Sequence, residues 1–184
     1  MKEQIADAKR RMRGAVASFQ GELAGVRTGR ATTALLDRVD VDAYGTSTPL
    51  NQLAGINVPE SRLITVQPYD PSILEAIEKG IMESGIGLTP NNDGQIIRLA
   101  IPELTEERRK ELTKLVSKMA EEARVAVRNV RRDVNNEMKR AEKDGEISKN
   151  ELSRYHDDVQ KLTDAEVKAI DELMERKEAE ILEV

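Results

Sequence analysis

Apolar residues recur at every third or fourth position over a long stretch of the chain that follows Thr105. The pattern runs from Leu112 through Val127 to Ala141, and an α-helix places residues with this spacing on one face. A helix cannot bury so long an apolar stripe by itself. The chain must therefore supply other helices of similar length to pack against it.

Two further stretches have the same spacing. The first covers residues 2–28 and is expected to end at Gly29, because glycine favours the end of a helix. The second begins at Ser148-Lys149-Asn150-Glu151, which matches a capping box, and its apolar face is expected to include Val159, Ala169 and Leu173. The three stretches predict one discontinuous three-helix bundle, formed by residues 1–29 and 105–184.

Residues 30–104 have a different pattern. Alternating or β-rich segments predict strands over three ranges, 38–43, 62–68 and 95–101. A short helix is expected after Asp70-Pro71, because aspartate caps helices and proline is favoured in the first turn. Turns are expected over 44–49 and 91–94. The fold class is therefore α+β, with a small β/α/β domain inserted between the first and second helices of the bundle.

The chain would cross between these two domains twice, and two short adjacent linkers favour relative motion. We therefore expect a hinge at the crossings, although Gly29 could simply end a helix. The predicted hinge residues are Thr28, Gly29, Arg30, Ala31, Pro102, Glu103, Leu104 and Thr105.

The formal net charge is −5, but the charge is unevenly distributed along the chain. Residues 31–104 carry four basic and ten acidic side chains, whereas residues 105–140 carry eleven basic and seven acidic ones. Four arginines, Arg124, Arg128, Arg131 and Arg132, fall in nine residues with no acid among them. On a helix the first three share one stripe, with Arg132 beside it. This pattern favours binding to a rigid polyanion. The alternative is a solvated helix face on which Glu121 and Glu122 pair with some of these arginines.

The few aromatic residues, the absence of cysteine and the single histidine exclude several kinds of binding site. The chain has one phenylalanine, three tyrosines and no tryptophan, so a stacking platform for unpaired bases is not expected. It has no cysteine, which excludes disulfides and thiolate metal sites. The single histidine, His156, is expected at the surface rather than in a metal site. We expect a cytoplasmic protein without a signal peptide or membrane span.

Several motifs together resemble the bacterial ribosome recycling factor family. They are Arg27-Thr28-Gly29-Arg30-Ala31, Leu104-Thr105-Glu106-Glu107-Arg108-Arg109-Lys110, Val127-Arg128-Asn129-Val130-Arg131-Arg132, Asn92-Asp93-Gly94 and Asp157-Asp158-Val159-Gln160-Lys161. The similarity extends over the whole chain and includes the order of its parts.

The resemblance implies an L-shaped, non-enzymatic factor that binds post-termination ribosomes. With elongation factor G and GTP it promotes splitting into subunits and release of tRNA and mRNA. The GTP is used by the elongation factor, so no cofactor is expected. The main contact is implied to be large-subunit rRNA, through Arg128 and Arg131. Weaker assignments are Arg124, Arg132, Arg27, Arg30, Arg108 and Arg109.

Two other classes of protein remain as alternatives. A coiled-coil scaffold could dimerise through its apolar seams, but three seams in one chain can cover one another, which favours a monomer. An enzyme is the weaker alternative, because the sequence has no phosphate-binding GxxxxGK[ST] loop, nucleophile elbow or zinc spacing. For Arg108 and Arg109, a role in starting the helix after Thr105 is compatible with RNA contact.

Overall fold

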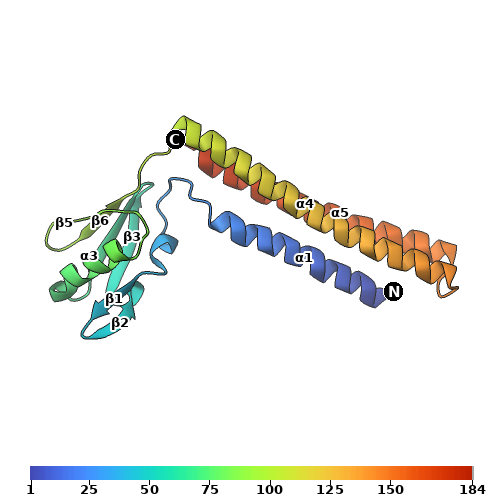
Figure 1. Cartoon of the computed structure of the whole chain (residues 1–184), viewed down its shortest axis with the longest axis horizontal. Coiled ribbons are helices and arrows are strands. Elements are labelled where there is room, and N and C mark those ends of the chain that lie inside the picture. Colours follow the sequence, from blue (N-terminus) through green and yellow to red (C-terminus); the bar gives the residue numbers. More distant parts are fainter. Residues whose placement is uncertain (184) are drawn as a thin grey trace. The chain divides into compact units, whose positions relative to one another are not determined.

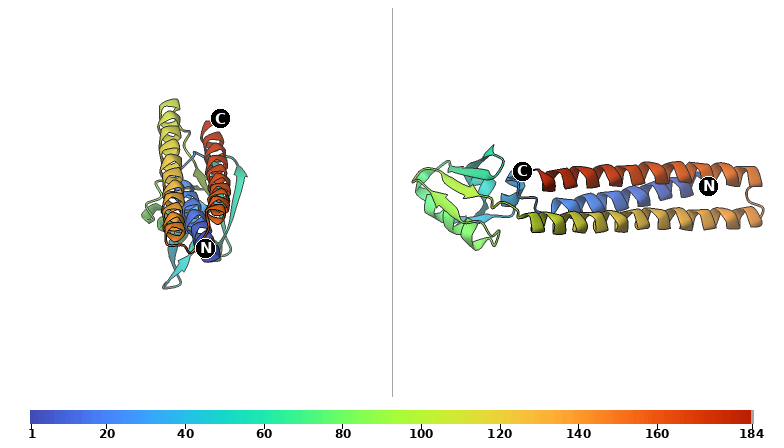
Figure 2. Two further views of the ribbon diagram at one scale, coloured as in Figure 1. Left: turned by 90° about the vertical axis from the view of Figure 1, so that its right-hand side faces the viewer. Right: turned by 90° about the horizontal axis from the view of Figure 1, so that it is seen from above.

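The computed structural model describes residues 1–183. It divides the chain into two compact units, Met1–Thr28 with Thr105–Val184, and Gly29–Leu104. The first unit holds three α-helices: α1 (Lys2–Ala24), α4 (Glu106–Lys143) and α5 (Lys149–Leu182). The three helices pack against one another side by side, as predicted (Figures 1 and 2).

The bundle is held by the apolar seams. Val116, Val127 and Met138 of α4 are fully buried, as are Met12 of α1 and Ile170 of α5. Between α4 and α5 the chain turns at Gly145, whose φ of 78° is in the left-handed region that favours glycine. The apolar face of α5 differs from the prediction, because Ile170 is buried while Ala169 is only half-buried.

Side-chain caps fix the starts of the two long helices. The Thr105 hydroxyl accepts a hydrogen bond from the Arg108 backbone N–H, 3.1 Å away. Ser148 and Glu151 form the predicted capping box at the start of α5. The backbone N–H of Ser148 lies 2.8 Å from the Glu151 carboxylate and lowers the pKa of that group. Both caps satisfy backbone N–H groups that the first turn of a helix leaves without partners.

The predicted end of the first helix is wrong by four residues. Helix α1 ends at Ala24, and Gly25 caps it with an ordinary right-handed φ of −77°. Gly29 belongs to the second unit and has a φ of 75°. A Cβ atom at Gly29 would lie 3.0 Å from Cγ of Leu104, so both the backbone conformation and the close approach require glycine.

The second unit contains two antiparallel sheets and several short helices (Figure 1). Strands β1 (Asp40–Ala43) and β2 (Thr46–Pro49) form a hairpin. Strands β3 (Ala54–Glu60), β4 (Leu63–Pro68), β6 (Ile97–Ala100) and β5 (Pro90–Asn92) form the second sheet in that order. The short helices are η1 (Thr33–Leu36), α2 (Leu50–Leu53), η2 (Pro71–Ile73) and α3 (Leu74–Glu83).

The predicted Asp70 cap and Pro71 start the 3-10 helix η2, where the Asp70 carboxylate accepts a hydrogen bond from the Ser72 backbone N–H. Helix α3 continues from η2 at Leu74 without a side-chain cap of its own. Its apolar face buries Ile77 and Ile81 together with Ile64 and Leu99 of the larger sheet. The helix also approaches the hairpin closely at Gly80, where an added Cβ would lie 3.0 Å from Cγ2 of Val41.

The three predicted strands correspond to β1, β4 and β6, but the unit has three more. Strand β2 occupies part of the segment predicted as a turn, and β5 takes in Asn91 and Asn92 of the second predicted turn. Strand β3 was not predicted, since it contains glycine and proline. It lies at the edge of its sheet, where Pro59 is tolerated, and its pairing register shifts between Asn57 and Glu60.

Candidate nucleic-acid interface

Arg124 of α4 pairs with acids inside the bundle. Its Nη2 atom lies 2.7 Å from Oδ1 of Asp171 on α5, and its Nη1 atom lies 3.0 Å from Oε2 of Glu121. Only 16% of the Arg124 side chain is exposed. Desolvation lowers the pKa of the guanidinium, but the hydrogen bonds to Asp171 and Glu121 outweigh it and raise the pKa above its ordinary value. Arg124 therefore connects two helices.

The other three arginines of the cluster are less constrained. Arg128 is 45% exposed at its side chain, and its Nη1 atom lies 3.3 Å from Oε1 of Glu121. Arg131 is half-buried, and it donates one hydrogen bond to Oε1 of Gln160 on α5, at 3.1 Å. Arg132 is exposed and makes no ion pair within the 183 described residues. The sequence therefore predicted the stripe, and its alternative of pairing with Glu121 applies to Arg124 and in part to Arg128.

The ion pairs with Glu121 and Asp171 separate Arg124, which binds within the bundle, from the other three arginines. Glu121 could be seen in the sequence, since residues three and seven positions apart lie on the same face of a helix. Asp171 could not, because its position depends on how α5 aligns against α4. The contact with Gln160 holds the Arg131 guanidinium without neutralising its charge. Arg128, Arg131 and Arg132 thus retain guanidinium charge that an anion can approach.

The other four arginines predicted to contact rRNA lie outside the α4 stripe. Arg108 is exposed at the start of α4 and pairs with Glu111, with 2.8 Å between Nη1 and Oε2. Arg109 is half-buried, and its Nε atom is buried without a hydrogen-bond partner in the part of the chain that the structure describes. Arg27 and Arg30 are exposed, but they fall in different units, Arg27 in the first and Arg30 in the second.

His156 differs from the prediction of a surface histidine. The residue is half-buried on α5, and its Nε2 atom is buried with no hydrogen bond from any described residue. No local pattern signals this burial, because the neighbours Asp157 and Asp158 are charged and exposed. Among residues 1–183 there is no group of three or more His, Asp or Glu side chains that could hold a metal ion.

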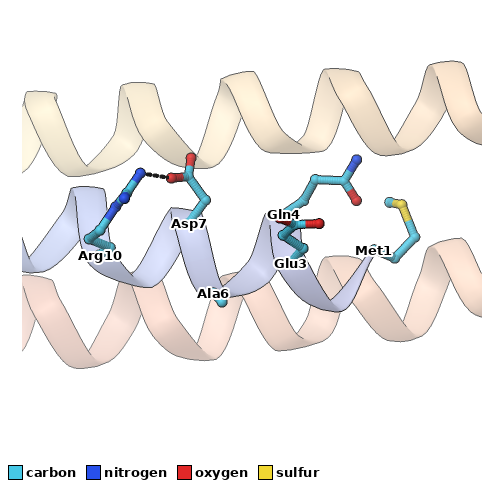
Figure 3. A pocket seen from close by; sticks show the side chains of 6 residues that line it. All are labelled: Met1, Glu3, Gln4, Ala6, Asp7 and Arg10. Atoms are coloured by element: carbon cyan, nitrogen blue, oxygen red, sulfur yellow. Dashed lines mark hydrogen bonds and ion pairs between the residues drawn. The ribbon is translucent and has the colours of Figure 1, made fainter.

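A pocket lies along the N-terminal end of α1 and is lined by side chains of that helix (Figure 3). Its cation, Arg10, is already paired with the Asp7 carboxylate, as the dashed line in Figure 3 shows. This pairing makes the pocket a weaker anion site than the exposed arginines of α4. No helix within residues 1–183 has the length and apolar composition needed to cross a membrane.

Known proteins share both the sequence and the fold. A family model described as ribosome recycling factor matches residues 19–182. The ribosome-recycling factor of Shouchella clausii is 58% identical over 183 residues, covering 100% of this chain and 99% of the relative. That of Listeria monocytogenes is 55% identical over 183 residues, with the same coverage.

Two solved structures are also similar. A solution structure of the ribosome recycling factor is 43% identical and has a TM-score of 0.77, covering 100% of this chain and 97% of that one. A second, with a TM-score of 0.63, 43% identity and 98% coverage of both chains, models the T. thermophilus ribosome recycling factor and the E. coli elongation factor G on the E. coli post-termination complex. These matches agree with the sequence motifs and with the long-helix bundle, and the chain belongs to the ribosome recycling factor family.

Proposed function

We propose that this chain binds large-subunit ribosomal RNA through guanidinium groups of α4. The observation that carries the proposal is the arrangement of Arg128, Arg131 and Arg132 on one helix of 38 residues. Arg128 and Arg132 are four positions apart, which is about 6 Å along the helix axis. This is less than the Debye length of about 8 Å at physiological salt, so their attractions to phosphate reinforce each other. Structured RNA is recognised largely by shape and phosphate contacts, which suits arginines without aromatic residues.

The bound ribosome is then split with the help of an elongation factor G, which uses the GTP. The similar structure that combines a ribosome recycling factor and an elongation factor G on the post-termination complex supports this partner. In this proposal the chain is a mechanical, non-enzymatic and cytoplasmic factor that needs no cofactor of its own. The bundle buries its three seams internally, which supports action as a monomer.

We place the hinge at the two chain crossings, in a shorter stretch than the eight predicted residues. Neither crossing has regular secondary structure. Ala31 donates its backbone N–H to the Ser61 carbonyl at 2.7 Å, and Glu103 pairs with Arg62 at 2.5 Å. These contacts bind Ala31 of the first crossing and Glu103 of the second crossing to the second unit. The pivot therefore lies nearer Thr28 and Thr105.

Subunit splitting followed by light scattering tests the function. Post-termination ribosomes are mixed with elongation factor G, GTP and either the wild-type chain or an Arg128→Ala, Arg131→Ala variant. We expect the double variant to bind ribosomes at least tenfold more weakly and to split them in proportion to its lower occupancy. A matched Lys168→Ala control removes one positive charge from a side chain of α5 that is 78% exposed, and it should act like wild type. Full splitting by the double variant at limiting concentration would refute the proposal.

The hinge has its own test. The chain has no cysteine, so a pair of cysteines placed one in each crossing forms a unique disulfide. The oxidised variant should bind ribosomes normally and split them more slowly, and reduction should restore the rate. Normal splitting in the oxidised form would remove the hinge from the mechanism.

A further inference from the structure

Two of the four aromatic residues of this protein are largely exposed. Tyr44 is 72% exposed and Tyr69 is 71% exposed, and both lie in the unit formed by residues 29–104. By contrast, Phe19 is buried and Tyr155 is half-buried in the bundle. Tyrosine is enriched where proteins contact partners, because its ring supplies much contact area with little conformational entropy to lose.

The backbone of Tyr44 is unfavourable for tyrosine. Tyr44 and Gly45 form the two-residue turn of the β1–β2 hairpin, and their φ angles of 52° and 77° are those of a type I′ turn. Asn-Gly is the favoured sequence for such a turn. Tyr44 is the one residue other than glycine with a positive φ among the described residues. Strained residues cluster at functional sites, so the exposed Tyr44 side chain is a candidate contact residue.

The Tyr44 ring is also held in place. Its hydroxyl donates a hydrogen bond to Oδ2 of Asp70, the residue that follows Tyr69. The other carboxylate oxygen of Asp70 accepts the Ser72 backbone N–H at 2.9 Å. These bonds lower the pKa of Asp70, so the carboxylate stays charged at neutral pH. The hydroxyl thus joins the hairpin turn to the segment that carries the second exposed tyrosine.

The charge around the two rings is negative. Asp40 and Asp42 are exposed on the strand that leads into the turn, and Asp70 follows Tyr69 and accepts the Tyr44 hydroxyl. No lysine or arginine occurs in the sequence from Val39 to Ser61 or from Leu63 to Glu78. Such a surface repels RNA phosphates, whereas it attracts a protein that presents positive charge. Arginine and lysine also bind the faces of tyrosine rings through cation–π contacts.

We propose that Tyr44, Tyr69 and Asp70 form a docking surface for a protein segment that presents arginine or lysine side chains. The inference rests on the proposed function, because the partner meets this surface while the chain is on the ribosome. The exposed arginines of α4 then contact RNA, and this acidic aromatic surface contacts a protein.

The test uses the full chain with Tyr44→Asn and Tyr69→Ser. Asparagine suits the turn better than tyrosine, which offsets the lost hydrogen bond to Asp70, so the variant should unfold at a urea concentration close to that of wild type. We expect ribosome binding within twofold of wild type and a splitting rate at least tenfold lower. A matched Met82→Ser control alters a side chain of the same unit that is 63% exposed, and it should split ribosomes normally.

A photocrosslinker identifies the contact. With p-benzoylphenylalanine in place of Tyr69, irradiation of post-termination ribosomes with elongation factor G and a GTP analogue should give a crosslink to a protein peptide rich in arginine or lysine. A crosslink to rRNA alone, or normal splitting by the double variant, would overturn this inference while leaving the proposed function intact. Failure of the wild-type chain to bind ribosomes would overturn both.

Discussion

The approach of α3 to the β1–β2 hairpin depends on the missing side chain of Gly80. An added Cβ would lie 3.0 Å from Cγ2 of Val41 and 3.1 Å from the carbonyl oxygen of Asp40. Val41 is fully buried, and Asp40 is paired in the hairpin with Pro49. Neither neighbour can move away without disturbing the hairpin. We therefore expect Gly80→Ala to destabilise the second unit.

The magnitude follows from two opposing effects. Alanine is favoured over glycine in a helix by about 1 kcal/mol. Overpacking a buried contact costs about 1–3 kcal/mol. Because the added Cβ would meet a fixed backbone oxygen as well as a methyl group, we take about 2 kcal/mol for the second effect. The net loss in the free energy of unfolding is then about 1 kcal/mol.

Two glycines of α1 provide matched controls. A Cβ at Gly14 or Gly21 would meet nothing within 4 Å, and both positions are exposed. Gly14→Ala and Gly21→Ala should therefore each stabilise the bundle by about 1 kcal/mol, the helix-propensity gain without the clash. The same substitution is thus expected to have opposite signs at helical sites that differ in their surroundings.

The assay must report each unit separately, because the two units need not unfold together. Urea-dependent hydrogen exchange, resolved by peptide, gives the opening free energy of α3 and β1 and, independently, that of α1. If Gly80→Ala stabilised the second unit as much as the controls stabilise the bundle, the close-approach argument would be refuted.

Three further predictions concern local interactions. The Ile96 backbone N–H and the Arg98 guanidinium hold the pKa of Asp93 well below its usual range. These contacts therefore stabilise the folded second unit above the unfolded pKa of about 4, and this stabilisation is lost as the pH falls below that value. Asp93→Asn should lower the urea midpoint of the second unit at pH 7, and the difference should shrink in acid. Ser148→Ala should cost the bundle about 1 kcal/mol through loss of the cap, measured as a change in the urea midpoint. Gly29→Ala should destabilise the second unit by about 1–2 kcal/mol because of its left-handed φ, and hydrogen exchange near the first crossing should rise.

Local sequence signals predicted much of the fold. The spacing of Val116, Val127 and Met138 marked the seam of α4, and Ser148 with Glu151 marked the start of α5. These signals act within a few residues of the chain, so they need no knowledge of the tertiary structure. The end of α1 was missed, because the helix stops at Ala24 before the glycine with a positive φ is reached.

The parts that were missed depend on tertiary alignment. Strand β3 exists because β4 pairs with it, although its own sequence contains glycine and proline. Likewise, the role of Arg124 was not visible, because Asp171 lies 47 positions away in the sequence. The sequence predicted a basic stripe on α4, but only the packing of α5 shows which of its guanidinium groups are used within the bundle.

The salt dependence of binding to large ribosomal subunits tests the role of the α4 arginines most directly. For wild type, Arg131→Ala and Arg124→Ala, the association constant is measured over a series of salt concentrations. Loss of a phosphate contact should make the slope of log K against log salt shallower by about one for Arg131→Ala. Arg124→Ala should weaken the bundle and leave the slope unchanged. If Arg131→Ala bound with the slope and affinity of wild type, RNA binding through this stripe would be contradicted.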